Sequence, residues 1–423
     1  MGEACFSIAD QAEIGEFMLV SNSAVSLWAP GNLFDCRRLF FYCKILVAVE
    51  IVTSLFFVAG TYGLIVPLTK PNTTDFVSFY AAGILTDAGT PQLVYDQAWH
   101  HAAEERATEP GIEYNYFYYP PVFLLVCALL GQLPYLVAFF AFEITTLVLF
   151  LFVARSILNE RGWAALLPIV AFPVVFWNFA FGQNAFLTAA LFGAGTLWID
   201  RRPLLAGILL GALCYKPQFG LLIPLALAAG GHWRAFASAL GSTVALCLLS
   251  LAMFGCETWH DFILAVAGSS AAYTSGRISF DGYINLFGAV RHLGGAENIA
   301  YAMQAVASLS AAALVAFVWH RGFALPFRAA SLASAALVAA PLALFYDLML
   351  GAIATLWLLR GNGRNRLSDW ERIALIGLFL LSLNPRRLAE FSHLPIGPFI
   401  ALALTGLVAA HALRHGVGSV PSR

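Results

Sequence analysis

Long apolar runs dominate this chain, and short polar breaks separate them. The runs are about 18–25 residues long, and about 20 residues of α-helix cross a bilayer. Lipid offers the backbone no hydrogen-bonding partners, and the runs are too continuous for barrel strands, so we expect helices. About 12 crossings are expected near 42–67, 134–157, 163–181, 184–199, 203–231 (two helices that meet at Lys216–Pro217), 235–254, 297–319, 328–345, 348–360, 370–385 and 395–413. The run 119–133 fits a full span, a half-helix or an interfacial piece.

Composition agrees with a membrane protein. Hydrophobic residues make up 60% of the 423 residues and charged residues only 11%, whereas soluble domains carry about 25% charged residues. The net charge of −1 indicates no nucleic-acid partner. The seven cysteines are scattered and form no CxxC or Cys/His cluster, so neither a zinc site nor a disulfide framework is expected. The prediction is one all-α polytopic membrane domain.

Basic residues predict the orientation, because they favour the cytoplasmic side of a membrane. Arg37, Arg38 and Lys44 lie at the start of the first span, so residues 1–38 are expected to be a cytoplasmic segment. The membrane domain then covers 39–413, with external loops at 68–118 and 255–296, and residues 414–423 form a cytoplasmic tail. Only seven of the 23 basic residues fall outside in this arrangement, namely Lys70, Arg106, Lys216, Arg277, Arg291, Arg386 and Arg387.

The first external loop carries a helical pattern. Apolar side chains recur at Phe76, Phe79, Tyr80, Gly83 and Ile84, which is the spacing of one helix face. Either residue of the Thr73–Thr74 pair is expected to cap this helix, and Thr90–Pro91 is expected to begin a second one. We predict two amphipathic helices that lie along the membrane interface.

Unusual polar groups converge on the external side in this topology, and polar groups within membrane domains are often functional. They suggest an external crevice lined by aromatic rings, acids and cations. The segments are Asp75, "YNYFYYPP" (114–121), "GQN" (182–184), "YKPQ" (215–218), "SFDGYIN" (279–285), "FYD" (345–347) and "NPRR" (384–387), while Glu50 and Glu143 lie within spans.

Several short motifs occur in a defined order. A D-F-x-x-F-Y-x-A-G segment at residues 75–83 follows the first span, and "LVYD" and "YPP" come next. "GQNAFLTAALF" then precedes an R-R-P-L-x-A-G-x-L-x-G segment that runs into "YKPQFGLLIP". Over residues 40–360 this order resembles glycosyltransferase family 87, which includes polyprenyl-phosphate-mannose-dependent α-1,2-mannosyltransferases.

The resemblance implies a GT-C fold in a bacterial cytoplasmic membrane, with the active site facing the exterior. Such enzymes pass a sugar, here mannose or a related one, from a polyprenyl-phosphate donor to a lipid or glycan acceptor. An acid in the first external loop usually serves as the base, and Asp75 occupies that position. Many relatives in the wider GT-C class carry two adjacent acids there, whereas this chain has Thr74–Asp75, which weakens the expectation of a paired-acid metal site. No cofactor and no metal ligands are expected, and a divalent cation is possible but not indicated.

The chemistry of an inverting displacement selects the other candidates. One carboxylate must take the proton of the acceptor hydroxyl, and cations must hold the leaving phosphate. Asp75 is either that base or an ordinary acid at a helix start. Lys216 either binds phosphate or snorkels from a helix end. The remaining phosphate candidates are Arg386, Arg387 and Arg277, and the substrate candidates are Tyr80, Tyr118, Tyr119, Gln183, Asn184, Gln218, Asp281 and Asp347.

Two readings compete with these assignments. The tyrosines either stack on sugars or belong to an interfacial aromatic belt. A transporter or lipid flippase without covalent chemistry is the alternative function, but transporters often show inverted repeats with broken helices near mid-membrane. Here the polar exceptions gather outside, and the first loop is long and patterned, which favours an enzyme.

Overall fold

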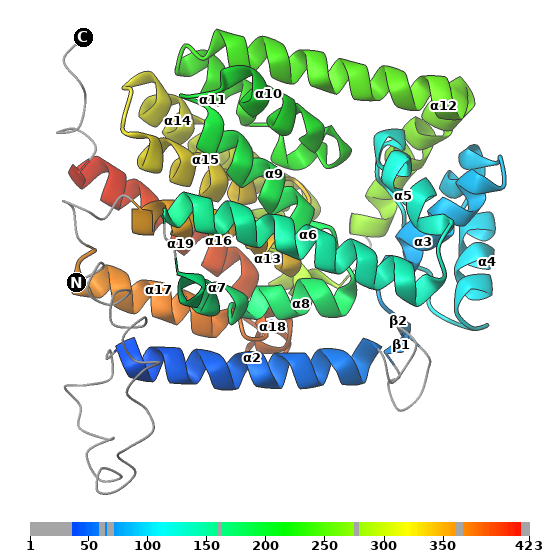
Figure 1. Ribbon diagram of the computed structural model, residues 1–423, viewed down its shortest axis with the longest axis horizontal. Coiled ribbons are helices and arrows are strands. Elements are labelled where there is room, and N and C mark those ends of the chain that lie inside the picture. The colour runs from blue at the N-terminus through cyan, green and yellow to red at the C-terminus, as the bar shows by residue number, and fades with distance from the viewer. Residues whose placement is uncertain are drawn as a thin grey trace, which may run out of the picture.

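The computed structural model describes residues 36–58, 64–65, 72–159, 162–274, 279–360 and 367–415, and nearly all of them are helical (Figure 1). Several long helices run across the view with shorter helices between them, and a separate group of short helices, coloured blue to cyan, stands at the right-hand end (Figure 1). The long helices are α2 (Cys36–Val58), α6 (Tyr135–Leu158), α12 (Trp233–Thr274), α14 (Glu297–His320) and α19 (Ile396–His415). The strands β1 (Leu64–Ile65) and β2 (Asn72–Thr73) form one short antiparallel pair.

Short helices fill the rest of the described chain. Those in the first half are α3 (Phe76–Asp87), η3 (Pro91–Tyr95), α4 (Gln97–Ala107), η4 (Pro121–Phe123), α5 (Leu124–Gly131), η5 (Trp163–Leu166), α7 (Leu167–Val170), α8 (Pro173–Phe181) and α9 (Ala185–Trp198). Those in the second half are α10 (Pro203–Gly211), η6 (Ala212–Tyr215), η7 (Pro217–Phe219), α11 (Ile223–Ala229), η8 (Phe280–Gly282), α13 (Leu286–His292), α15 (Leu325–Ala339), η9 (Phe345–Leu348), α16 (Met349–Arg360), α17 (Asp369–Leu381) and α18 (Pro385–Ser392).

Five described helices are long and apolar enough to cross a membrane, namely α2, α6, α12 up to Ser269, α14 and α19. A sixth span results if α7 and α8, which are bent by 63°, form one crossing. The expectation of about 12 crossings is not confirmed, because the other apolar helices are only 10–17 residues long. Residues such as Pro217 end these helices early, since proline removes a backbone donor and clashes with the preceding turn. The chain is a multi-pass membrane protein.

The described part of the segment expected as the first external loop, from Asn72 onward, is folded as a buried unit. A helix at α3 confirms the spacing argument, but Asp75 rather than a threonine occupies the N-cap position. Nearly all of α3 is buried, and it packs against α4 and α5, so it is not an amphipathic helix on the interface. Gly83 and Gly131 allow this packing, since a Cβ on Gly83 would lie 2.2 Å from the carbonyl oxygen of Cys127.

The expected start of a second helix at Thr90–Pro91 is confirmed, because Thr90 occupies the N-cap position of η3 and Pro91 is its first residue. That helix ends at Tyr95, however, and the side chain of Asp96 caps α4 by accepting from the N–H groups of Ala98 and Trp99. The expectation of a loop over 255–296 was wrong for its first part. The segment 255–296 begins as a helix, because α12 continues to Thr274 after a break at Gly255, where φ is +81°. Only glycine adopts that backbone conformation without strain.

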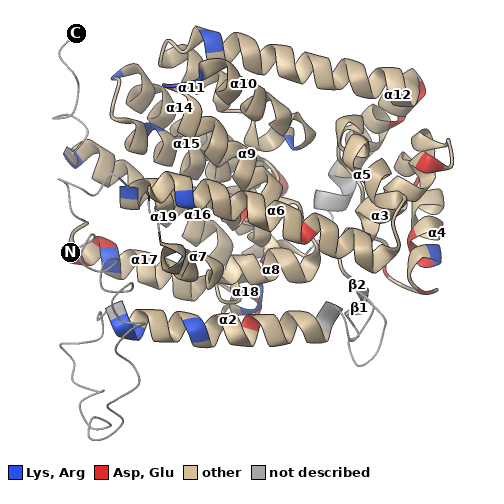
Figure 2. Cartoon of the chain, viewed as in Figure 1, with Lys and Arg blue, Asp and Glu red and all other residues tan. Residues whose placement is uncertain are grey.

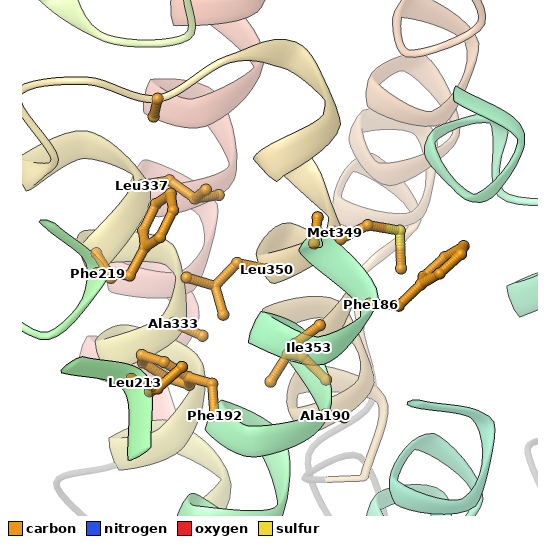
Figure 3. Packing of buried hydrophobic residues seen from close by; sticks show 14 of the residues in the cluster. Phe186, Ala190, Phe192, Leu213, Phe219, Ala333, Leu337, Met349, Leu350 and Ile353 are labelled. Atoms are coloured by element: carbon orange, nitrogen blue, oxygen red, sulfur yellow. The ribbon is translucent and has the colours of Figure 1, made fainter. Parts of the chain in front are cut away.

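The main hydrophobic core extends through most of the helices from α3 to α19, and Figure 3 shows the part of it where α9, α15 and α16 meet. Phe186 of α9 lies beside Met349 of α16, Phe192 of α9 lies beside Leu213, and Leu337 of α15 packs beside Phe219 (Figure 3). The aromatic and branched side chains are almost completely buried. This packing fixes α9 and α16, which follow the chain breaks that carry the polar residues.

Charge is distributed unevenly along the long axis, although acidic residues also lie on α17 at the left and a basic residue lies on α4 at the right (Figure 2). Blue Lys and Arg residues mark the left-hand ends of α2, α12 and α19, whereas red Asp and Glu residues gather at the right-hand end around α3, α4 and the bend of α12. The α3–α4 unit therefore lies at the acidic end of the molecule.

Candidate active site

Breaks between helices bring the polar segments together. Residues 182–184 separate α8 from α9, Lys216 separates η6 from η7, and Asp347 lies in η9 just before α16. Gly182 makes the first break possible, because its φ is +65° and a Cβ there would lie 2.5 Å from the Cβ of Phe76. Irregular backbone is tolerated inside a membrane protein where it is buried in protein or lines a cavity.

Lys216 is the centre of a buried polar cluster. Its ammonium donates to Asp347 Oδ1 at 2.6 Å and to Asn184 Oδ1 at 2.9 Å. The second carboxylate oxygen of Asp347 accepts from the backbone N–H of Leu344 at 3.0 Å. Only 4% of each charged side chain is exposed. Lys216 therefore joins three chain breaks, and a phosphate would have to compete with Asp347 for it.

Asp75 occupies the N-cap position of α3, but its side chain does not cap the helix. Its side chain makes no hydrogen bond to the helix N-terminus. Oδ2 instead accepts from Gln183 Nε2 at 2.7 Å, and Gln183 is almost fully buried. Because Asn184 is the next residue and binds Lys216, the acid and the lysine cluster are held by neighbouring positions of one loop.

The environment of Asp75 suits a base. Burial raises the pKa of its carboxyl from 3.8 to about 6, while the Gln183 hydrogen bond and the charge of Arg386 lower it. A base is most effective when its pKa lies near the working pH but below it. Asp75 is thus ionised at neutral pH and more basic than an ordinary aspartate.

The two arginines of α18 have different surroundings. Arg386 is exposed, and its charge acts on Asp75. Arg387 is also exposed and donates to Glu390 Oε2 at 2.8 Å. Of the four predicted phosphate-binding cations, Arg386 is the one whose charge is felt by Asp75, whereas Arg277 lies outside the described residues.

The three tyrosine candidates also differ in their surroundings. Tyr119 lies beside the site, with its hydroxyl 3.5 Å from Gln183 Oε1. The Tyr118 ring lies parallel to Tyr116 at 5.6 Å between centroids. The Tyr80 hydroxyl donates to the carbonyl of Leu133 at 2.7 Å, so it is used in packing α3.

The two remaining substrate candidates are Gln218 and Asp281. Gln218 is half-buried next to the Lys216 break, and its side chain makes no hydrogen bond within the described ranges. Asp281 lies in η8, which packs on α18. Its carboxylate accepts from Ser279 at 2.6 Å and contacts His292 Nδ1 at 2.9 Å, so it orients a histidine.

The structure adds residues that the sequence did not single out as site candidates. Asn178 is fully buried in α8, and its amide donates to the carbonyl of Gln183 at 2.8 Å. A lone Asn four residues before "GQN" was the available signal. Glu104, which lies in the segment 68–118 expected as an external loop, is fully buried beside His100, and burial raises its pKa to about 9.

The comparisons with known proteins name one family. The model of glycosyltransferase family 87 matches residues 117–345, just over half of the chain. Gln183, Asn184 and Lys216 lie inside the match, whereas Asp75 and Arg386 lie outside it. No curated protein and no solved structure matches the chain. On the strength of the family match, the chain belongs to glycosyltransferase family 87.

Proposed function

We propose that this chain transfers a sugar, mannose or a related hexose, from a polyprenyl-phosphate donor to a lipid or glycan acceptor outside the cytoplasm, within a GT-C fold. Membership of family 87 supports glycosyl transfer by a membrane protein. One observation carries the mechanistic part of the proposal: the carboxylate of Asp75 is turned away from its own helix and held by Gln183 at 2.7 Å.

The proposed reaction is a single inverting displacement. Asp75 takes the proton of the acceptor hydroxyl as its oxygen attacks the anomeric carbon of the donor sugar. The bond from that carbon to the phosphate oxygen breaks, and polyprenyl phosphate leaves with the bonding electrons. A phosphate leaving group needs no general acid, but it needs cations to hold its charge. Arg386 is the candidate whose charge acts on Asp75.

The charge pattern supports an external site. Basic residues favour the cytoplasmic side, and Asp75 lies with α3 at the opposite, acidic end (Figure 2). We therefore propose that the left-hand end of Figure 2 faces the cytoplasm of a bacterial cell and that the donor headgroup meets Asp75 at the outer surface of the membrane.

A transfer assay tests this function against transport. Purified protein in nanodiscs is given polyprenyl-phosphate-mannose with a labelled sugar and a panel of acceptor lipids. We expect labelled acceptor and free polyprenyl phosphate to appear in equal amounts. In proteoliposomes, movement of the intact labelled donor across the bilayer with no sugar transferred would instead identify a flippase.

A further inference from the structure

Glu143 is a buried acid within the α6 span that the proposed reaction does not use. None of its surface is exposed. Oε2 accepts from Asn178 Nδ2 at 3.2 Å, while Oε1 has no hydrogen-bond partner in the part of the chain that the structure describes. Ionisable groups within membrane spans are costly and are functional candidates by default.

Asn178 uses its whole amide to fix the break between α8 and α9. Its Nδ2 donates to Glu143 and to the carbonyl of Gln183, and its Oδ1 accepts from the N–H of Ala185 at 2.9 Å. The break has little freedom elsewhere, because Gly182 is pressed against Phe76, the residue next to Asp75. A change at Asn178 must therefore move Gln183.

Gln183 connects the Glu143–Asn178 hydrogen bonds to the proposed base, since its Nε2 donates to Asp75 Oδ2. We propose that Glu143 is a positioning residue: by accepting from Asn178, it fixes Gln183 and so sets the direction in which the Asp75 carboxylate points. Its catalytic consequence rests on the proposed function, in which Asp75 is the base. The contact with Asn178 needs an acceptor oxygen and does not need a negative charge.

Because Asn178 needs an acceptor oxygen at position 143, two substitutions of Glu143 should have different effects. Glu143→Gln keeps an oxygen for Asn178, whereas Glu143→Met keeps most of the volume and removes the acceptor. A buried amide N–H without an acceptor is unfavourable, so in Glu143→Met we expect Asn178 to turn and release Gln183. Ile144→Leu is the matched control, because Ile144 is the next residue and is 50% exposed.

Infrared titration of the Asp75 carboxylate reads this geometry directly, with the band assigned by subtraction of Asp75→Asn. The pKa of Asp75 is about 6, and the Gln183 hydrogen bond lowers it. Loss of that bond should raise the midpoint by about one pH unit in Glu143→Met, since one pKa unit is a typical change from one charged-group hydrogen bond. The other groups that act on Asp75 or feel its charge are unchanged, namely Arg386, Glu104, Tyr119 and Tyr135.

We expect wild type, Glu143→Gln and Ile144→Leu to share one midpoint, and Glu143→Met to titrate higher. In the transfer assay the kcat of Glu143→Met should be about tenfold lower than that of wild type, because the free energy of one pKa unit corresponds to about a tenfold change in rate. The KM for the donor should stay within about twofold. Glu143→Leu replaces Glu143→Met if the latter does not fold. A wild-type midpoint in the folded Met or Leu variant overturns the proposal, as does a Glu143→Gln midpoint as high as that of Glu143→Met. A wild type that transfers no sugar but gives the expected midpoints refutes the proposed function and leaves the positioning role standing.

Discussion

Replacement of Asp75 by asparagine is expected to lower kcat by about 10²–10⁴-fold, the usual contribution of a general base. The amide cannot take a proton, but its oxygen can still accept from Gln183, so the local geometry should remain. Stability should change little, because the Asp75 side chain does not cap α3. The measurement is the initial rate of sugar transfer, together with the thermal midpoint of the purified variant.

Asp87→Asn is the control for this substitution. Asp87 is exposed at the other end of the same helix, so it tests the loss of one acid from α3 without touching the site. It should keep the wild-type rate. Full turnover by Asp75→Asn would exclude Asp75 as the base.

Lys216→Met is expected to destabilise the protein by about 3–5 kcal/mol, the usual cost of leaving one charge of a buried pair without its partner. Asp347 would keep its bond to the N–H of Leu344 but lose the ammonium at 2.6 Å. Asn184 would lose its contact as well, so transfer should fall even in protein that remains folded. Denaturant titration in detergent measures the loss of stability.

A second substitution distinguishes a lysine that stabilises the fold through its ion pair with Asp347 from a lysine that binds phosphate. Lys216→Met combined with Asp347→Leu removes both charges, and apolar replacement of a buried pair is often neutral or stabilising. Arg387→Gln is the control, since breaking its exposed pair with Glu390 should cost less than about 1 kcal/mol. If Lys216→Met were as stable as wild type, the ion pair between Lys216 and Asp347 would not stabilise the fold.

Local patterns were sufficient to predict part of this structure. The spacing of Phe76, Phe79 and Tyr80 predicted α3, because helix periodicity is a property of neighbouring residues. The same pattern predicted an interfacial helix, but α3 is buried on nearly all sides. A periodic face indicates one packing surface, and it carries no information about a second surface contributed by α4 and α5.

Long-range pairs explain the other errors. Gln183 meets Asp75 across 108 positions, and Lys216 meets Asp347 across 131 positions, so no local pattern could pair them. Listing polar exceptions found all four residues but did not show which would touch. Glu104 lies in the segment expected as the first external loop, where acids are usually solvated, and its burial depends on how α4 packs against the segment that contains Asn115. The helix breaks also shortened apolar runs that composition alone counts as spans.

The pH dependence of kcat/KM for the wild-type enzyme tests the central claim most directly, because it reports the ionisation of the free enzyme's essential base. Asp75 must be ionised to act, and its pKa is raised to about 6. The rate should therefore be level above about pH 7 and fall tenfold per pH unit well below about pH 6, as expected for one titrating group. A profile that stayed level down to about pH 4, where an ordinary aspartate titrates, would contradict Asp75 as the base in this environment.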